Sequence, residues 1–481
     1  MKPQPSDGRP LRGAAPARPV VAVRHGRLVR LSAPAAAAAS IKAEPPGVPA
    51  QVVAPSTRAA ILLFICVLFV PSVFFLGPIA LPPALLYLAI GFLPLLTSWL
   101  SGRAGPRTAT DLLVLGFASW AFLTRLLLLD IGNALEPAGV VLLQTAGAYF
   151  TGRVLVRNAG ATRLVFASAM IGVAVLLPVL LWESVTGSKP LLDLAALFSS
   201  TLLPTHMDPR WGFHRAQGVF EHPILLGMFA ATLVSAAVFM FPGRQGRLMR
   251  WFGTPAVILA AMTSLSTGAL LSMNIQFGLM LWNAILRTVQ KRWTILISLV
   301  IALYIAADLL SDRTPFHLFV DYATFSAQSS YNRILIWQFG SAAVMDSPLL
   351  GHGTDDWERP AFMHASMDNF WLVIAYRYGL PGLILLAAAF VVSIWRIAHH
   401  PETDVEGRDM RRGVIFSLVA TMIAAVSVHL WNNSYIWLMF ALGTVSWMTR
   451  TDDGEPIGPT PMNSEPQPSQ DRHARLRRLG F

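Results

Sequence analysis

Two arginines stand beside apolar segments of the chain, where a guanidinium group could hold a phosphate. Arg215 begins the string Arg-Ala-Gln-Gly-Val-Phe-Glu-His-Pro just before an apolar run, and Arg333 begins Arg-Ile-Leu-Ile-Trp. A guanidinium group offers a planar fork of N–H donors that fits phosphate oxygens in a bidentate manner. The alternative for Arg215 is an arginine that extends to the membrane interface along its apolar stem. For Arg333 the alternative is an ion pair with acidic residues of the same segment.

A third arginine, Arg377, lies inside an apolar run, within Tyr-Arg-Tyr-Gly-Leu-Pro-Gly. Ionisable residues in membrane segments are costly to bury and commonly functional, which also draws attention to Arg125. Arg377 could reach an anionic headgroup, or it could pair with an acidic residue of a neighbouring helix. Arg210, Arg313 and Arg359 are expected to pair with nearby acids.

Histidines are candidate bases because imidazole titrates near neutral pH. Seven of them fall on the same side of the membrane map as Arg215 and Arg333: His206, His214, His222, His317, His352, His364 and His429. Their spacing contains no His-Glu-x-x-His or other metal pattern, so no metal site is expected. No glycine-rich phosphate loop or Gly-x-Ser-x-Gly elbow occurs, and no cofactor is expected. The single cysteine, Cys66, is expected to be a buried, inert thiol.

The elements that must position these residues are membrane helices. The chain has 481 residues, of which 54% are hydrophobic and 13% are charged. A soluble domain would carry close to a quarter of charged residues, which excludes a cytosolic globular enzyme. Runs of about 17–25 apolar residues are long enough to cross a bilayer, and backbone groups in lipid must then pair within helices.

Twelve spans are predicted, which gives an all-α polytopic membrane protein. They are 58–76, 79–98, 110–129, 138–156, 163–183, 221–241, 252–268, 270–286, 293–310, 369–394, 413–430 and 433–449. The pair 252–268 and 270–286 is nearly continuous, interrupted only by a polar stretch around Ser264 to Gly268.

The positive charges orient these spans. With the N-terminus inside, 29 of the 37 lysines and arginines fall on inside segments, six on outside segments and two within spans. Basic residues accumulate on the cytoplasmic side, so both termini are predicted to be cytoplasmic. The net charge of +11 therefore reflects inside loops rather than nucleic-acid binding, because no motif interleaves the basic residues with aromatics.

This map divides the chain into three parts. Residues 1–57 and 450–481 are expected to be cytoplasmic tails, the first flexible and able to touch anionic lipid. Residues 58–449 form the transmembrane domain. Its two long outside segments, 184–220 and 311–368, should fold back over the helices, since long loops are uncommon unless functional. The middle of the second, about 326–345, can form an interfacial helix.

Three short motifs resemble the O-antigen ligase and polysaccharide polymerase superfamily of bacterial inner membranes. The string from Arg215 to Pro223 is similar to its Arg-x-x-Gly-x-Phe-x-x-Pro signature. The stretch 333–353 is similar to its Arg-x-x-x-Trp … Pro-x-x-Gly-x-Gly segment. The third, beginning Asp368-Asn369-Phe-Trp-Leu, is similar to its Asn-x-x-Leu … Gly-x-x-Gly entry to the next span. Each motif is weak alone, but their order and spacing over about 215–390 make the set specific.

The resemblance implies a multi-span, lipid-donor glycosyltransferase that works at the periplasmic face of the inner membrane, with a large periplasmic loop between spans 9 and 10. The donor would be a glycan on undecaprenyl diphosphate, and the acceptor another glycan or lipid A-core. Arg215 and Arg333 match the family's diphosphate-binding arginines. His222 and Asn369 lie within the motifs and are expected to contact substrate, as is Arg377 from its own position.

The residue at the position of the expected proton acceptor differs from that of the family. A histidine normally precedes the asparagine of the third motif, and here that residue is Asp368, with His364 four residues earlier. Either Asp368 or His364 would serve as the base. The departure leaves both a ligase and an O-antigen or exopolysaccharide polymerase open. A lipid-linked glycan transporter, or flippase, is the alternative from another class, and an assembly subunit is a lesser one.

Overall fold

The computed structural model describes residues 53–310 except Pro78, residues 327–400 and residues 405–449, with two short strands near the N-terminus. Those strands, β1 (Val23–Arg24) and β2 (Arg27–Leu28), pair antiparallel within a unit formed by residues 1–50. Residues 51–481 form a second unit, which carries everything below. Most of the expected N-terminal tail, the whole expected tail 450–481, and Arg313 and His317 lie outside the described residues.

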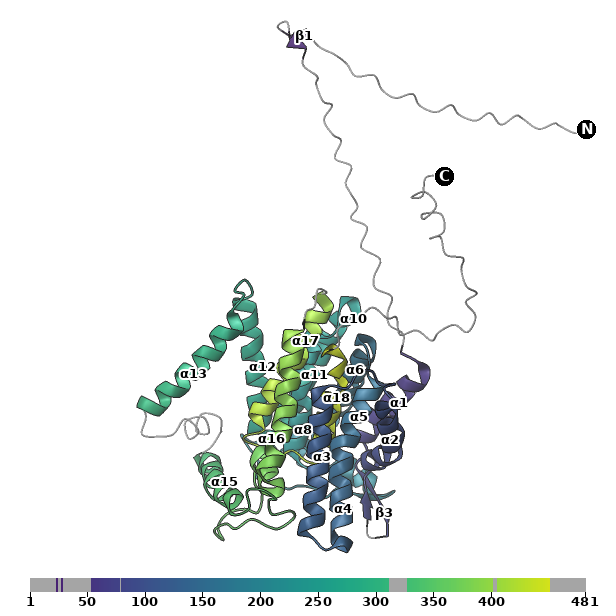
Figure 1. The fold of residues 1–481 in the computed structure, drawn as a ribbon, viewed down its shortest axis with the longest axis vertical. Helices are drawn as coiled ribbons and strands as arrows, with labels where there is room; N and C mark the ends of the chain where they lie inside the picture. The colour runs from purple at the N-terminus through teal and green to yellow at the C-terminus, as the bar shows by residue number, and fades with distance from the viewer. Residues whose placement is uncertain are drawn as a thin grey trace, which may run out of the picture. The chain divides into compact units, whose positions relative to one another are not determined.

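The second unit is mainly helical (Figure 1). Its first helices are α1 (Pro55–Leu68), α2 (Pro83–Leu100), α3 (Ala109–Leu128), α4 (Ile131–Leu142), α5 (Ala148–Leu155), α6 (Ala159–Thr186) and α7 (Pro190–Ala196). The middle ones are α8 (Pro223–Thr232), α9 (Val234–Phe239), α10 (Gly243–Leu248), α11 (Thr254–Thr263), α12 (Thr267–Ile285) and α13 (Arg292–Leu310). The last are α15 (Ala327–Asp346), α16 (Phe370–His399), α17 (Val405–Ala424) and α18 (Asn432–Thr444).

Five of the described helices are long and apolar enough to cross a bilayer: α2, α3, α6, α13 and α16. Two shorter apolar helical segments, Pro55–Leu68 and Pro223–Phe239, accompany them. The mainly helical fold is therefore confirmed, and its long apolar helices are consistent with a membrane protein. The number of twelve spans and the sidedness of the loops stay predictions.

A small β-sheet replaces part of the first two predicted spans. The helix expected over 58–76 ends at Leu68, and the chain continues into β3 (Ser72–Leu76) and β4 (Ile79–Leu81). The strand β5 (Ser200–Thr201) completes the sheet in the order β4-β3-β5. Prolines explain the difference, because Pro71 and Pro82 flank the hairpin and a proline cannot continue a helix without losing a backbone hydrogen bond.

Regular α-helix is interrupted at three further points. α4 and α5 are joined by a π-helical turn over Leu143–Gly147. α11 and α12 are separated at the polar stretch noted in the sequence, where Leu265 has a φ of 47°. α16 is interrupted at Gly379, whose φ is 70° and ψ is 178°.

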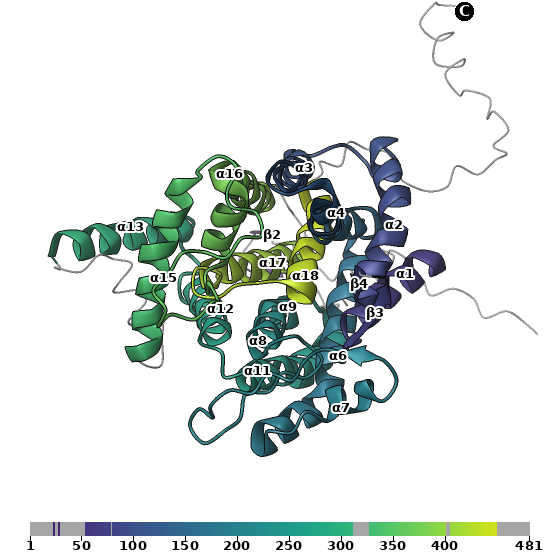
Figure 2. The same cartoon turned by 90° about the horizontal axis from the view of Figure 1, so that it is seen from below.

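The helix α18 lies at the centre of the unit, as Figure 2 shows in the view from below. All its residues from Asn433 to Thr444 are buried. Glycines allow α18 to approach α5 closely, since a Cβ on Gly443 would meet the Tyr149 carbonyl and one on Gly152 would meet the Phe440 carbonyl. Small residues at a helix interface serve the same purpose in many membrane proteins.

A buried ion pair fixes the end of α3 that lies away from the site. Asp111 and Arg153 are fully buried and 3.0 Å apart. Arg153 also donates to the carbonyls of Ala104 and Pro106, at 2.6 and 2.7 Å, and Trp99 Nε1 donates to Asp111 at 3.0 Å. Arg153 is therefore a structural residue.

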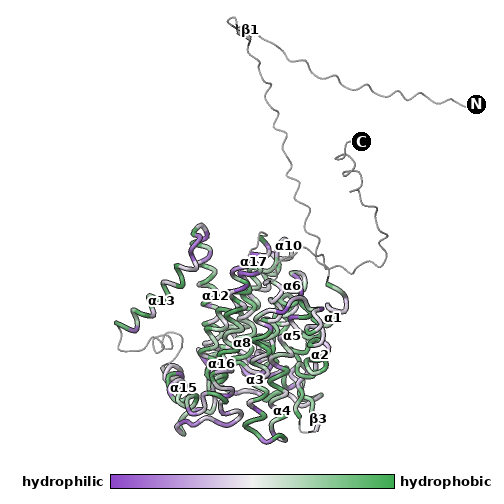
Figure 3. The backbone as a smooth tube through the Cα atoms, in the orientation of Figure 1, coloured by the Kyte–Doolittle hydropathy of each residue, from purple (hydrophilic) through white to green (hydrophobic). Residues whose placement is uncertain are grey.

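Many exposed residues of the helices are large and hydrophobic. Figure 3 shows the hydrophobic colour along most of α13. None of the described residues of α13 is buried. The expectation for Cys66 was wrong, because this residue is exposed on the surface of α1. Hydropathy cannot distinguish a helix face that meets the core from one that meets lipid.

Candidate active site

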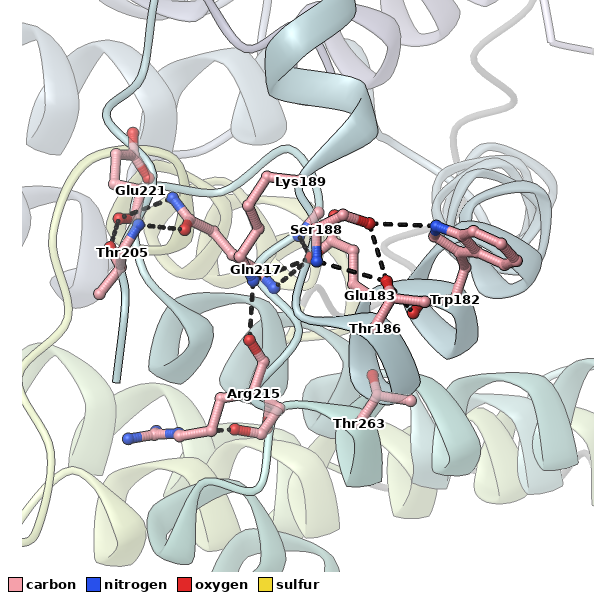
Figure 4. A network of polar contacts seen from close by, with 12 residues as sticks. Trp182, Glu183, Thr186, Ser188, Lys189, Thr205, Arg215, Gln217, Glu221 and Thr263 are labelled. Atoms are coloured by element: carbon pink, nitrogen blue, oxygen red, sulfur yellow. Dashed lines mark hydrogen bonds and ion pairs between the residues drawn. The ribbon is translucent and has the colours of Figure 1, made fainter. Parts of the chain in front are cut away.

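A network of polar contacts fixes the loop that carries Arg215 (Figure 4). Glu183 Oε2, at the end of α6, accepts hydrogen bonds from Lys189 Nζ at 3.1 Å and from the backbone N–H groups of Gln217 and Gly218 at 2.9 and 3.1 Å. Lys189 also donates to the Arg215 carbonyl at 2.8 Å. Glu183, at the end of the fifth predicted span, thus holds the backbone of the first motif in place.

The same loop is held from its other side by Gln217. Its side-chain amide donates to the carbonyls of Leu203 and Glu221, at 3.1 and 3.2 Å, and accepts from Thr205 N at 2.8 Å. The Ala216 N–H donates to the Thr263 carbonyl at the end of α11, at 2.9 Å. With its backbone fixed in this way, Arg215 extends away from the Glu183–Lys189 pair (Figure 4).

Three arginines, two from the loop before α8 and one from α15, converge on the turn between α11 and α12. Arg215 Nε donates to the Ser264 carbonyl at 3.0 Å, and Arg210 Nη1 donates to the Leu265 carbonyl at 2.8 Å. Arg333, from α15, donates to Thr267 Oγ1 at 2.8 Å through Nη2 and to the Ser427 carbonyl at 3.2 Å through Nε. One short turn therefore gathers three positive charges.

These arginines line a cavity of about 920 Å³. Its charged and imidazole side chains are Arg210, Arg215, Arg333, Arg377, Asp355, Asp356, Asp368, His222, His364 and His429. Of the seven residues predicted from the sequence, six line this cavity. The exception is Asn369, a buried residue whose side chain caps α16 by accepting a hydrogen bond from Leu372 N at 3.1 Å.

Asp368 lies within electrostatic reach of two of the arginines. Burial raises the pKa of its carboxyl above the usual range, while Arg333, a hydrogen bond from Ser366 and Arg215 act against that rise. Burial also lowers the pKa of Arg215 to about 10. Arg215 thus stays cationic at neutral pH. His364, by contrast, is exposed at the cavity.

His222 caps α8, and this contact sets its tautomer. Its Nδ1 accepts a hydrogen bond from Ile224 N at 3.1 Å. In the neutral imidazole the other nitrogen, Nε2, then carries the proton and can donate into the cavity. The ring of Trp431 lies 5.8 Å from that of His222, and both line the cavity.

The second and third motifs meet at the break in α16. His352 N donates to the Tyr376 carbonyl at 2.8 Å, and Leu380 N donates to the Pro348 carbonyl at 2.7 Å. Gly351 and Gly379 both have positive φ, and a Cβ on either would collide with backbone of the other segment. The glycines of the two motifs therefore allow the loop 348–353 to join α16, beside Arg377.

Several cavity residues were not predicted from the sequence. Arg210 was expected to pair with an acid, and it bonds a backbone carbonyl of the α11–α12 turn instead. Ser266 is 1% exposed, lines the cavity and has no hydrogen-bond partner for its Oγ among the described residues. The polar stretch that interrupts the apolar run around Ser264 was the feature of the sequence that could have indicated Ser266. Arg359 does pair with Asp356, at 2.6 Å, as predicted.

The family model described as O-antigen ligase matches residues 252–387. The chain carries an O-antigen ligase domain. The match confirms the superfamily resemblance that the three motifs indicated. It runs from the start of α11 into α16, and it includes Arg333 and Asp368 but not Arg215. No curated protein matches the chain.

Within the part of the chain that the structure describes, no group of three or more histidine, cysteine, aspartate and glutamate side chains could hold a metal ion. The cavity, lined partly by the matched residues 252–387 and partly by residues outside them, thus presents arginines, two candidate bases and a helix N-terminus. These are groups that bind an anion and accept a proton.

Proposed function

We propose that this protein is a glycosyltransferase that transfers or polymerises an undecaprenyl-diphosphate-linked glycan. The O-antigen ligase domain supports a membrane enzyme that joins glycans. The reaction takes place at the periplasmic face of a bacterial inner membrane, with both termini cytoplasmic. This orientation follows from the distribution of basic residues along the sequence.

The convergence of Arg210, Arg215 and Arg333 on one turn carries the proposal. When the glycosidic bond of the donor breaks, the diphosphate leaves with added negative charge. Guanidinium groups that are already in place stabilise this charge without reorganisation. The cavity beside them is large enough for sugar residues, and it is lined by Trp357, Tyr376 and Trp431.

The N-terminus of α12 adds uncharged donors to the same place. The first N–H groups of a helix have no partner within the helix, and they favour an anion. The Ser266 hydroxyl, buried and without a partner among the described residues, precedes α12 at the cavity wall. We assign it to a phosphate oxygen of the donor.

Asp368 is the proton acceptor in this proposal. The hydroxyl oxygen of the acceptor sugar attacks the anomeric carbon of the donor, and the bond from that carbon to the diphosphate oxygen breaks. The hydroxyl proton passes to the Asp368 carboxylate, and the electron pair leaves with the diphosphate. Asp368 lines the same cavity as Arg333 and Arg215, and both arginines act on its carboxyl electrostatically.

The experiment that tests this proposal replaces Arg333 in purified protein reconstituted into liposomes with undecaprenyl-diphosphate-linked glycan. Arg333→Ala is expected to lower the rate of glycan transfer by about 10²-fold or more, as the loss of one preplaced donor does elsewhere. Arg333→Lys keeps the charge without the fork of donors, so it should retain part of the rate.

The matched control is Arg163→Ala, which removes an arginine from a partly exposed pair with Glu406 outside the cavity. This variant should transfer glycan at the normal rate. Normal transfer by Arg333→Ala would refute the proposal. Movement of the donor across the bilayer without formation of a glycosidic bond would favour a transporter.

A further inference from the structure

A second arginine site lies inside the helical bundle. Arg125, in the last turn of α3, is only 4% exposed. Its Nε and Nη1 have no hydrogen-bond partner among the described residues. Its Nη2 reaches only the hydroxyl of Tyr378, at 3.4 Å, and the guanidinium carbon lies 5.2 Å from the centre of that ring.

This arginine faces a second cavity, of about 380 Å³. Aromatic residues of α3, α16 and α18, among them Phe117, Phe370 and Tyr435, form part of its wall. Glu136 also lines it, yet no ion pair joins Glu136 to Arg125 in the described part of the chain. The charge of Arg125 is therefore not neutralised by a neighbouring side chain.

The two cavities share a wall. Thr354, Val373, Arg377, His429, Trp431 and Asn432 line both of them. Molecules bound in the two cavities would meet at Arg377 and Trp431. This is the arrangement that a transferase with two saccharide substrates requires, because the reacting groups must approach each other closely.

The unpartnered donors of Arg125 indicate the chemistry of the occupant. Burying a polar group without a hydrogen bond is costly, and a charge costs more. Its position in the last turn of α3 suits the helix dipole, but that interaction leaves two buried nitrogens unsatisfied. A phosphate oxygen would satisfy them with charge-assisted hydrogen bonds.

We propose that Arg125, together with Arg377, binds a phosphate group of the acceptor, while the first cavity binds the donor. The assignment to the acceptor rests on the proposed function. The phosphate has two sources: the diphosphate of a second lipid-linked glycan, as in a polymerase, or the phosphorylated disaccharide of lipid A-core, as in a ligase.

The test counts bound ligands on the full-length protein in nanodiscs. Farnesyl diphosphate is the probe for a lipid diphosphate, and deacylated lipid A bisphosphate is the probe for the lipid A headgroup. If both cavities take lipid diphosphates, wild-type protein binds two equivalents of farnesyl diphosphate, and Arg125→Gln and Arg333→Gln bind one each. If the second cavity takes lipid A, Arg125→Gln weakens binding of the bisphosphate by about tenfold or more.

The outcomes separate the two proposals. Unchanged binding of both probes by Arg125→Gln would overturn the acceptor site. Unchanged binding of farnesyl diphosphate by Arg333→Gln would overturn the donor site, whatever Arg125 does. The equivalent that Arg125→Gln retains in the first cavity shows that the variant is folded, and Arg125→Lys should keep the second site with weaker binding.

Discussion

Single residues of the site balance charge against burial. Both Arg215 and Arg333 lower the pKa of the Asp368 carboxyl, and its burial works in the opposite direction. A carboxyl with a raised pKa is a stronger base once it is ionised, and the nearby arginines act against the rise that burial causes. The aspartate in place of the family's histidine is therefore compatible with proton transfer.

Asp368→Asn is expected to lower glycan transfer by about 10²–10⁴-fold, because the amide cannot accept the proton. In the wild type, the rate should fall as the pH falls through the raised pKa of Asp368, since the protonated form is inactive. Arg333 lowers this pKa, so the residual activity of Arg333→Gln should be lost at a higher pH. Initial rates measured across a pH series check both statements.

His364→Gln is the matched variant for the base. It should keep most of the activity, because His364 is exposed and its role is not needed if Asp368 accepts the proton. Loss of activity in His364→Gln together with retention in Asp368→Asn would reverse the assignment.

The sequence was informative about residues that lie within a motif and uninformative about residues that meet only through folding. Arg215, Arg333 and Arg377 could be predicted because each is a cation in an apolar setting. Arg210 and Ser266 could not, since their role arises from contacts of the α11–α12 turn with a loop about 50 residues away. Asn369 was predicted to bind substrate, but the structure uses its side chain as a helix cap.

Among the elements, the break in α16 decides the shape of the cavity wall. The loop 348–353 occupies the break, and Tyr376 and Arg377 offer their carbonyls to His352 and Gly353, at 2.8 and 3.2 Å. Those carbonyls belong to the turn of α16 that carries Arg377 into both cavities. Substrate binding should thus depend on residues that do not touch substrate.

Gly351→Ala is expected to destabilise this junction. Its φ of 75° costs a residue with a Cβ about 1–2 kcal/mol, and the added atom would lie 2.6 Å from the Tyr376 carbonyl. The apparent melting temperature in detergent should fall, and transfer activity should fall with it.

Gly278→Ala is the control, because this glycine of α12 has no atom within 4 Å of an added Cβ and lies in a regular helix. Alanine should leave the melting temperature unchanged or raise it slightly. Equal melting temperatures for the two variants would show that the glycine at 351 is not needed for the junction.

Hydropathy predicted the positions of the helices well where no proline interrupts the apolar run at its start. The long helices α6 and α16 begin within four residues of the predicted spans 163–183 and 369–394. The hairpin of β3 and β4 was missed, because an apolar strand and an apolar helix have the same hydropathy. Prolines on either side of the hairpin were the better guide.

On the scale of the whole molecule, the second unit has two distinct ends. In Figure 1, α10 and the beginning of α17 lie at one end, and β3 and α15 lie at the other. The loops that line the cavities belong to the end with β3 and α15. The count of basic residues predicts that this end is periplasmic.

Single cysteines test this orientation. In a Cys66→Ser background, Phe198→Cys should react with a membrane-impermeant maleimide in spheroplasts, since Phe198 is 83% exposed in the loop before β5. Val405→Cys, 61% exposed at the start of α17, should react only after the membrane is opened. The opposite pattern would invert the protein and exclude a periplasmic site.

The short turn from Ser264 to Thr267 shows that neutral residues can determine where charged side chains lie. It carries no formal charge, yet it supplies the acceptors that hold three guanidinium groups in place. The positive potential of the cavity therefore depends partly on uncharged residues, because they position the arginines. Substitutions that change the backbone of this turn would therefore change the affinity of the cavity for an anion, even with every arginine retained.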